Sequence, residues 1–280
     1  PIGGVLGRIC AKKLSISKVI YTAHGFHFYK GAPVINNVIY KNVERFLARY
    51  TDILVTINKE DYEAAKKFKL RKNGQVYLVH GVGINSSIFQ INDFDRLKYR
   101  KKFGINLNNI VLIAIGELNK NKNFDIIIKA ISLVRDKNIH LLICGTGKEK
   151  ERLVKLVKKY NLIDNIHFIP QLLLSSDILV QASYREGLPR SIMEAMAVGL
   201  PCVVSNIRGN RDLIKDNKGG FLNRVDSPKE FAKSIFVLIN NPSLRNRMGE
   251  FNKQFVKQFD TTNVKNKLLE IYNIFENKED

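Results

Sequence analysis

The feature that most constrains this sequence is an alternation of short apolar segments with longer amphipathic ones. The apolar segments are rich in β-branched residues and apolar at every position, which is typical of strands buried on both faces of a parallel sheet. Strands are predicted at 19–24, 53–57, 76–80, 110–116, 140–145, 166–169, 178–182 and 202–205. Helices are predicted at 35–50, 60–69, 124–135, 148–160 and 190–198. This repeated βαβ order predicts a doubly wound α/β fold.

The alternation is interrupted once, which indicates two domains. Residues 86–108 are polar and charged, and the pattern restarts at Ile110. Downstream there are enough strands for a complete Rossmann-like domain. Upstream there are too few for a sheet with covered edges, so we expect either that an amino-terminal portion is absent, which we favour, or that a partner supplies strands.

The expected domains follow from this interruption. They are a partial amino-terminal domain at 1–88, a second domain at 89–260, and a terminal helix at 261–280 that can cross back to the first domain. The tail shows apolar residues at three- and four-residue spacing over 231–239, 243–259 and 263–275, which predicts helices there.

The chain is strongly basic, with 46 Lys and Arg against 26 Asp and Glu and a net charge of +20. Such a charge indicates an anionic partner, whether nucleic acid, an acidic membrane face or a phosphorylated substrate. The basic residues are dispersed, and no zinc finger, homeodomain or RNP-type strand accompanies them, which argues against nucleic acid. No apolar run reaches the length of a membrane-spanning helix.

The cysteines Cys10, Cys144 and Cys202 each lie in an apolar run. They are predicted to be small core residues in a reducing compartment. No Cys/His cluster indicates a metal site.

Chemistry is concentrated in residues 183–201, which read Ser-Tyr-Arg-Glu-Gly-Leu-Pro-Arg-Ser-Ile-Met-Glu-Ala-Met-Ala-Val-Gly-Leu-Pro. The segment follows a predicted strand and opens a helix, with Pro189 suited to the first helical turn and Gly199 to the carboxy-terminal cap. The first amides of such a helix favour an anion such as a diphosphate. Glu186 and Glu194 frame this turn, and a carboxylate can accept two hydroxyl hydrogen bonds from a sugar or ribose diol.

The spacing of Glu186 and Glu194, with Gly187, Leu188 and Pro189 after the first, resembles the signature of family 4 retaining glycosyltransferases. The longer string resembles the branch that builds bacterial capsular and other surface polysaccharides on lipid carriers. The resemblance implies a GT-B fold, meaning two Rossmann-like domains, here with the amino-terminal one incomplete. It assigns Glu186 to the sugar and Glu194 to the ribose. The alternative is an ordinary strand, turn and helix with two solvated glutamates.

Two further glycine-containing loops match this resemblance. Residues 115–124 read Ile-Gly-Glu-Leu-Asn-Lys-Asn-Lys-Asn-Phe, and they correspond to the loop that neutralises the donor diphosphate, with Gly116 and Lys122 at the matching positions. Glu117 departs from the family, since many members carry Arg there, which leaves Lys122 as the main positive charge, with Lys120 as a candidate helper. Gly145 belongs to a Gly-x-Gly near the nucleotide. Taken alone, both loops also fit plain exposed turns.

Two residues outside these loops complete the expected site. His24, in the aromatic segment 21–33, matches the family's histidine that positions the transferred sugar; His27 matches less well. Arg208 can meet a phosphate bidentately or form a surface salt bridge. The connection at 169–175 looks shorter than the family's, which is a further departure.

The resemblance implies an enzyme that moves a hexose or N-acetylhexosamine from a nucleotide-diphosphate sugar, expected to be a UDP-sugar, to a lipid-linked saccharide with retention. It implies catalysis by His24, Lys122 and Glu186, without a metal or other cofactor. An anionic membrane surface is the expected partner, at the inner face of the plasma membrane, with no nucleic acid. An inactive truncated remnant and a sugar-nucleotide epimerase of the same fold stay as alternatives.

Overall fold

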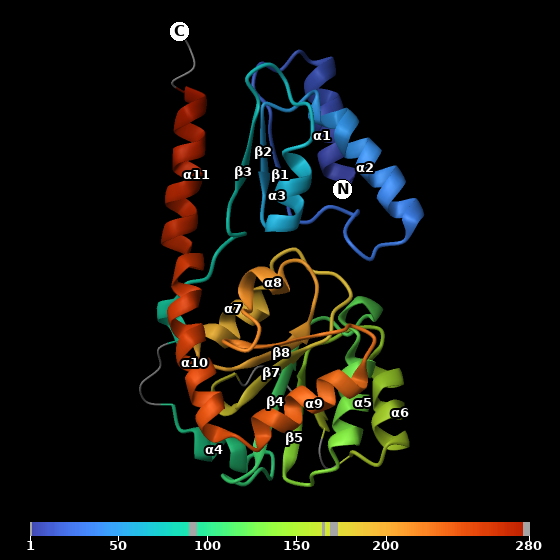
Figure 1. Ribbon diagram of the computed structural model, residues 1–280, viewed down its shortest axis with the longest axis vertical. Coiled ribbons are helices and arrows are strands. Elements are labelled where there is room, and N and C mark those ends of the chain that lie inside the picture. Colours follow the sequence, from blue (N-terminus) through green and yellow to red (C-terminus); the bar gives the residue numbers. More distant parts are fainter. Residues whose placement is uncertain (1, 90–93, 164–165, 169–172, 277–280) are drawn as a thin grey trace. The chain divides into compact units, whose positions relative to one another are not determined.

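The computed structural model describes residues 2–89, 94–163, 166–168 and 173–276 (Figure 1). The chain divides into two compact units. Unit 1 contains Pro1–Gly83, Glu186–Leu188 and Phe259–Asp280, and unit 2 contains Ile84–Arg185 and Pro189–Gln258. The sequence predicts these divisions between residues 88 and 89 and between residues 260 and 261.

Unit 1 is built on a three-stranded parallel sheet with the order β1-β2-β3. Its strands are β1 (Ile20–Ala23), β2 (Ile53–Thr56) and β3 (Gln75–Leu78). The helices are α1 (Ile2–Lys13), α2 (Val34–Ala48), α3 (Lys59–Ala65) and α11 (Thr261–Glu276). In Figure 1, α11 lies on one side of this sheet and the other helices lie on the opposite side.

The two faces of β2 explain why that strand is mostly apolar. Leu54 packs with aromatic residues of the segment after β1 and with α2 and α3. Ile53 and Val55 face the other way and pack against Val264 and Ile271 of α11. Because successive side chains point to opposite faces, a strand covered on both sides is mostly apolar, and its one polar residue, Thr56, is buried with its hydroxyl donating to the Tyr77 carbonyl at 3.2 Å.

Unit 2 is built on a six-stranded parallel sheet with the order β6-β5-β4-β7-β8-β9. Its strands are β4 (Ile110–Ile115), β5 (Ile139–Cys144), β6 (Ile166–Phe168), β7 (Ile178–Gln181), β8 (Cys202–Ser205) and β9 (Gly220–Asn223). In sequence order this is the 3-2-1-4-5-6 arrangement of a Rossmann fold, with its switch point between β4 and β7. The predicted α/β fold class is therefore confirmed.

Helices cover this sheet. They are α4 (Arg96–Lys101), α5 (Phe124–Val134), α6 (Lys150–Lys159), α7 (Arg190–Ala197), α8 (Asn210–Leu213), α9 (Pro228–Ile239) and α10 (Pro242–Val256). One core joins β4, β5 and β7 to α5, α6 and α9. Short 3-10 turns occur at Ser86–Phe89, Lys120–Lys122, Leu173–Ser175 and Lys257–Phe259.

Several elements were not predicted from the sequence, among them α1, α4, α8 and β9. Three glycines lower the helix propensity of α1, and β9 begins at a glycine, which weakens a strand pattern. The boundary stretch 86–108 contains α4, whose Arg96 and Arg100 both donate to Asp177 at 2.5 and 2.7 Å. The stretch therefore belongs to unit 2 and is not a plain connection.

One of the three cysteines differs from the sequence-based prediction. Cys10 is exposed, so its assignment to the core is wrong, whereas Cys144 and Cys202 are buried. Cys10 lies on a helix with one face toward solvent. The predicted end of a strand at Ile169 and the shortened connection at 169–172 lie outside the described residues. Among the residues that the structure does describe, no helix is both long and apolar enough to cross a bilayer.

Candidate functional site

The loops that follow β4 and β5 pack backbone against backbone. The Gly116 N–H donates to the Cys144 carbonyl at 3.0 Å, and the Leu118 N–H donates to the Thr146 carbonyl at 2.8 Å. A Cβ atom at Gly145 would lie only 1.9 Å from the carbonyl oxygen of Gly116. Glycine at position 145 is thus required by the close approach of the two loops, whether or not the loops also hold a ligand.

Lys122 is held beside the carboxyl end of β4. It lies in the 3-10 turn Lys120–Lys122, where its N–H donates to the Asn119 side-chain oxygen at 3.0 Å. Its Cε atom is 3.0 Å from the position that a Cβ on Gly116 would occupy. Glu117, at the position where the family resemblance implies an arginine in many members, is exposed and accepts a hydrogen bond from the Asn119 amide at 3.0 Å. Gly116 and Lys122 are therefore neighbours.

The loop that carries Lys122 is tied to the segment after β7 by Asn121. The Asn121 carbonyl accepts the Tyr184 N–H at 2.8 Å, and the Asn121 side-chain amide donates to the Arg185 carbonyl at 3.0 Å. The Ser205 hydroxyl at the end of β8 donates to the Ser183 carbonyl at 2.7 Å. These bonds bring the ends of β4, β7 and β8 together at the switch point. Sequence reasoning did not select Asn121, because its role depends on these contacts.

Helix α7 begins at this edge of the sheet. Pro189 is its N-cap, with φ −72° and ψ 120° and no side-chain capping bond, so it stands one residue before the predicted helical turn. The first amides of α7 have no acceptor within the helix. At the other end Gly199 has φ +80°, and Leu200 and Gly199 donate to the carbonyls of Ala195 and Met196. The predicted glycine cap is confirmed.

Glu194 is paired within α7. Its side chain is 18% exposed and accepts a hydrogen bond from the Arg190 Nε at 3.0 Å. Arg190 is the first residue of the helix, where a positive charge opposes the helix dipole. An anion bound there would remove that conflict. Sequence reasoning did not select Arg190, since a lone arginine beside a motif carries no signal.

Arg208 follows β8 and is 4% exposed. The alternative that it forms a surface salt bridge does not fit this burial. The Asn210 side-chain amide donates to the Ser205 carbonyl at 2.9 Å and fixes the turn that contains Arg208.

The remaining predicted residues lie in unit 1. His24 follows β1, is exposed, and lines a pocket of about 490 Å³ together with Thr22, Ile57 and Gly81. Apolar residues of α11 also line it, namely Val264, Leu268 and Leu269. Within the same unit, a Cβ on Gly187 would lie 2.2 Å from the His24 carbonyl oxygen. Glu186, Gly187 and Leu188 are half-buried.

The segment after His24 is fixed from α3. Asp61 is 1% exposed and accepts the Phe26 N–H at 3.0 Å and the Asn58 side-chain amide at 2.8 Å. Glu60 accepts the Lys30 N–H at 2.8 Å. Sequence reasoning did not select Asp61, which in the structure positions the loop behind His24.

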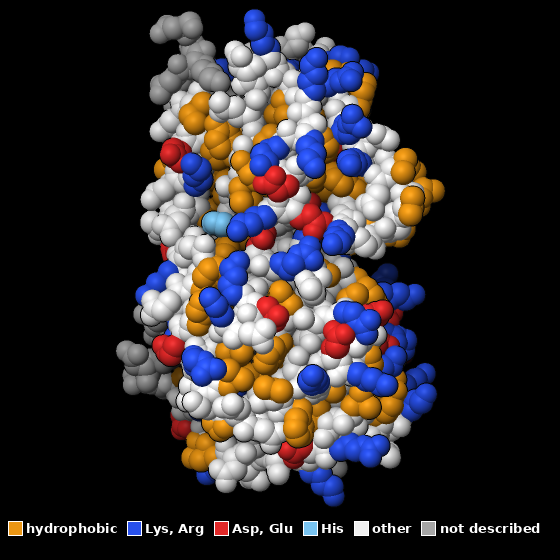
Figure 2. All heavy atoms as spheres, viewed as in Figure 1, with side chains coloured by type: hydrophobic (Ala, Val, Ile, Leu, Met, Phe, Trp, Pro, Cys, Tyr) orange, Lys and Arg blue, Asp and Glu red, His pale blue; other side chains and the backbone are white. Residues whose placement is uncertain are grey.

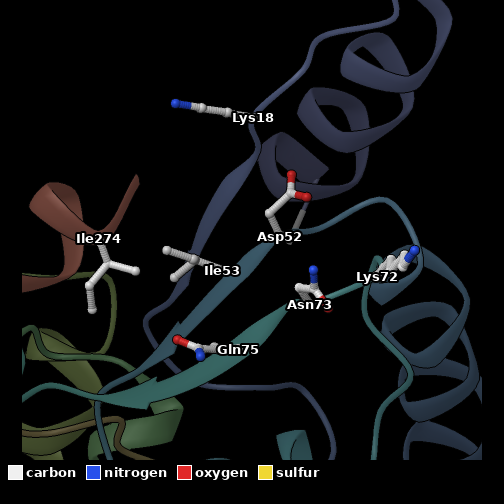
Figure 3. Close-up of a pocket in the computed structure, with 7 residues that line it drawn as sticks. All are labelled: Lys18, Asp52, Ile53, Lys72, Asn73, Gln75 and Ile274. Carbon is white, nitrogen blue, oxygen red and sulfur yellow. The ribbon is translucent and has the colours of Figure 1, made fainter. Parts of the chain in front are cut away.

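A smaller pocket of about 160 Å³ lies at the amino ends of the unit 1 strands (Figure 3). Its acidic residue, Asp52, accepts the Val19 N–H at 2.8 Å and an Arg71 N–H at 3.0 Å. Figure 3 shows Ile274 of α11 facing Ile53 across this pocket. None of the predicted site residues lines it, and its carboxylate serves the fold. Within the described ranges, no three His, Cys, Asp or Glu side chains are grouped so that they could hold a metal ion.

Comparison with known proteins bears on this site. The family model described as "Glycosyl transferases group 1" matches residues 95–255. A relative named putative glycosyltransferase EpsD, from Bacillus subtilis, is 34% identical over 98% of this chain and 75% of its own length.

The chain belongs to the group 1 glycosyl transferases.

A further relative and a solved structure are also similar to this chain over most of its length. An Escherichia coli relative, named UDP-Gal:alpha-D-GlcNAc-diphosphoundecaprenol alpha-1,3-galactosyltransferase, is 29% identical over 96% of this chain and 72% of its own length. The crystal structure of Anabaena HepE in complex with UDP superimposes with a TM-score of 0.83 at 20% identity, over 96% of this chain and 75% of that one. The glycosyl transferase match lies within residues that form most of unit 2, whereas His24 falls outside it.

Proposed function

We propose that this glycosyl transferase moves a hexose or N-acetylhexosamine from a UDP-sugar to a lipid-linked saccharide in bacterial surface polysaccharide synthesis, as a retaining enzyme of the family 4 type. The observation that carries the proposal is the joining of the Lys122 loop to the segment after β7 by Asn121. This junction lies at the switch point of a Rossmann-ordered sheet, where open α/β sheets bind their ligands.

Comparisons support the choice of donor and acceptor. Anabaena HepE has been crystallised with UDP and with UDP-glucose. The name of the E. coli relative specifies a UDP-sugar as donor and a diphosphoundecaprenol-linked sugar as acceptor. Both chemistries suit a protein of net charge +20, because donor and acceptor each carry a diphosphate.

In the proposed donor site, positively charged groups of unit 2 bind the diphosphate. Departure of the diphosphate leaves negative charge, which the Lys122 ammonium and the first amides of α7 would stabilise. Arg190 adds a further positive charge at the same helix end. Gly116 and Gly145 would let the backbone approach the nucleotide closely. Arg208, being buried, would act on a phosphate with little screening by water. No metal or other cofactor is part of this proposal.

The two glutamates and the histidine are assigned to hydroxyl groups. Glu194 would accept hydrogen bonds from the ribose hydroxyls, which requires Arg190 to share or yield its contact. Glu186 would hold hydroxyls of the transferred sugar, and His24 would position that sugar. The transition state would resemble an oxocarbenium ion, as in other reactions at an anomeric carbon.

The proposal is tested by incubating the chain with UDP-glucose, UDP-galactose or UDP-GlcNAc and a polyprenyl-diphosphate-linked GlcNAc. The acceptor is expected to gain the mass of one sugar, and nuclear magnetic resonance of the product is expected to show the anomeric configuration of the donor. Glu186→Ala should abolish transfer, whereas Glu151→Ala, an exposed glutamate of α6, should not.

Other outcomes favour the alternative functions. Conversion of the UDP-sugar to an epimer without acceptor would identify an epimerase. Donor binding by a folded chain with no transfer to any acceptor would identify an inactive remnant. Full turnover by Glu186→Ala would remove that residue from the site.

The proposal places the enzyme in the cytoplasm, peripherally on the inner face of the plasma membrane. A nucleotide sugar and a membrane-embedded acceptor meet at that surface.

A further inference from the structure

Helix α2 of unit 1 exposes an unusual run of apolar side chains. Its exposed fractions are 79% for Val34, 65% for Ile35, 55% for Val38, 52% for Ile39 and 54% for Phe46. Residues three and four positions apart share one side of a helix, so Val34, Ile35, Val38 and Ile39 form a continuous stripe, and Phe46 lies two turns further along the same side. We call it the α2 stripe. Figure 2 shows hydrophobic side chains (orange) gathered on unit 1 over α2.

Basic side chains continue the α2 stripe toward the end of the helix. Lys41, Arg45 and Arg49 are all exposed, and they follow the apolar residues at the same helical spacing. Figure 2 shows Lys and Arg side chains (blue) beside the orange group. The exposed side of α2 therefore carries apolar residues in its first half, and cationic residues together with Phe46 in its second.

The exposed charges of α1 and α2 are all positive. The only acidic residue of α2 is Glu44, which is 7% exposed and accepts a hydrogen bond from Arg8 of α1 at 2.9 Å. Helix α1 has no acidic residue and ends in Lys12 and Lys13. The buried pair thus leaves α1 and α2 with exposed charges of one sign, which complements an anionic surface.

The combination distinguishes a lipid surface from a protein partner. A docking site for another folded protein is typically apolar at its centre with mixed charges at the rim. A helix that lies in a bilayer interface combines an apolar face with Lys and Arg beside it, and these cations meet the lipid phosphates. The α2 stripe has the second composition.

We propose that α2 docks this protein onto an anionic lipid bilayer, with Val34, Ile35, Val38 and Ile39 at the boundary of the acyl chains and Lys41, Arg45 and Arg49 at the headgroup phosphates. The inference extends the proposed function, since a lipid-linked acceptor requires the enzyme at a membrane. It rests on the surface of α2 and uses none of the residues assigned to the donor.

The chain contains no tryptophan, so a single introduced tryptophan reports on one position. Ile39→Trp places the probe in the α2 stripe. Phe236→Trp, on the exposed side of α9 and 56% exposed, is the matched control. With vesicles of phosphatidylglycerol and phosphatidylcholine, the emission of Ile39→Trp is expected to shift to shorter wavelength and to be quenched by brominated lipids, while that of Phe236→Trp stays unchanged. Equal shifts for both probes, or none for Ile39→Trp, would overturn the proposal.

The charged half of the stripe is tested separately. The triple change Lys41→Gln, Arg45→Gln and Arg49→Gln is expected to weaken sedimentation with these vesicles at least about tenfold, given three lost contacts to anionic lipid. The matched control removes three exposed charges from α6, at Lys155, Lys158 and Lys159, and should bind vesicles as the parent does. Equal losses in both would show that net charge alone drives binding and would contradict a specific surface.

Two further measurements separate membrane docking by α2 from a catalytic role of this helix and from dimerisation. Transfer to a short-chain, water-soluble acceptor should be unchanged in the α2 variants; loss of transfer there would place α2 in the reaction and overturn a docking role.

If Ile35→Ser with Ile39→Ser converts a dimer into a monomer in sedimentation velocity while vesicle binding persists, the stripe is an interface between two copies. Unaltered circular dichroism ensures that each variant is folded. If the parent binds vesicles but does not transfer sugar, the proposed function is rejected while the docking proposal is supported.

Discussion

Lys122 carries most of the proposed stabilisation of the leaving diphosphate. Its neighbour Glu117 removes the second positive charge that the family resemblance would place in this loop, and Asn119 holds the turn through both of them. Lys120 lies in the same 3-10 turn, but Lys122 is the lysine whose side chain lies against Gly116 at the end of β4, so its ammonium should carry the larger part of the effect. Its effect is expected in turnover, because the charge develops as the donor bond breaks.

Lys122→Ala is expected to lower kcat for transfer by about two to three orders of magnitude, a typical loss when one donor to a developing charge is removed. Lys155→Ala, on exposed α6, is the control. Steady-state kinetics with a UDP-sugar would measure both. A loss below about threefold in Lys122→Ala would show that other groups carry the leaving-group charge.

Arg190 was not selected from the sequence, although the structure places it at the first position of α7 and against Glu194. If it contributes to anion binding, Arg190→Ala should weaken UDP binding about fivefold, in the range of one charge at a helix end, and Arg190→Lys should restore most of it. Calorimetry would decide. Unchanged or tighter UDP binding in Arg190→Ala would indicate that Arg190 pairs with Glu194 and does not contribute to anion binding.

At the scale of elements, the site depends on how closely the loops after β4 and β5 approach each other. Gly145→Ala would push a Cβ against the Gly116 carbonyl, which lies 1.9 Å from that position. We expect a loss of about 1–3 kcal/mol in the free energy of unfolding, as for other overpacked sites, and weaker UDP binding. Gly3→Ala, in α1 with no atom within 4 Å of the new Cβ, should cost no stability. Equal unfolding midpoints for the two variants would contradict the close packing of these loops.

Helices α5 and α6 are joined by an ion pair in which Arg152 donates to both oxygens of Asp125, at 2.6 and 2.7 Å. The hydrogen bond from Arg152, opposed by partial burial, holds the pKa of Asp125 below its ordinary value. A depressed carboxyl pKa stabilises the fold above the unfolded pKa of about 3.9, and this contribution is lost as pH falls through the folded value.

Asp125→Asn should therefore destabilise the protein at pH 7, by less than about 1 kcal/mol because Arg152 is half exposed. The difference from the parent should shrink below about pH 4 and vanish under more acidic conditions. Urea unfolding at several pH values would measure it. A difference that stays constant down to acidic pH would show that packing, and not charge, explains the effect.

Elements with one dominant physical cause could be predicted from the sequence. Strands such as β2 and β4 are mostly or wholly apolar because their side chains are buried on both faces. The end of α7 could be predicted to within one residue because Gly199 adopts a positive φ. Helix α1 and strand β9 could not be predicted, since the first depends on the buried Arg8–Glu44 pair and the second on pairing with β8. Local propensity is weak in both.

The residues of the candidate site likewise fall into those that a sequence motif identifies and those that only the structure identifies. Lys122, Glu186 and Glu194 were selected through a motif, and what the structure adds is where each lies. Asn121, Asp61 and Arg190 act through contacts between segments far apart in the chain or through position on a helix, and no sequence pattern marks such contacts. The positions that hold a site together are therefore harder to predict than those proposed to touch the ligand.

At the scale of the whole molecule, the predicted residues are distributed over two units. Gly116, Lys122, Gly145, Pro189, Glu194 and Arg208 lie in unit 2, and His24 and Glu186–Leu188 lie in unit 1. The residues proposed to bind the diphosphate and the ribose all lie in unit 2, so nucleotide binding should follow from unit 2. Docking through α2 should follow from unit 1. The two activities should therefore respond to separate sets of substitutions.

The most direct test of the central claim is calorimetric titration of the chain with UDP, beside Lys122→Ala and Glu194→Ala. We expect the parent to bind, and both variants to lose most of the affinity while keeping the parent's circular dichroism. That result would place the diphosphate at the end of β4 and the ribose at α7. Absence of binding by the folded parent, or full affinity in both variants, would contradict the site described here.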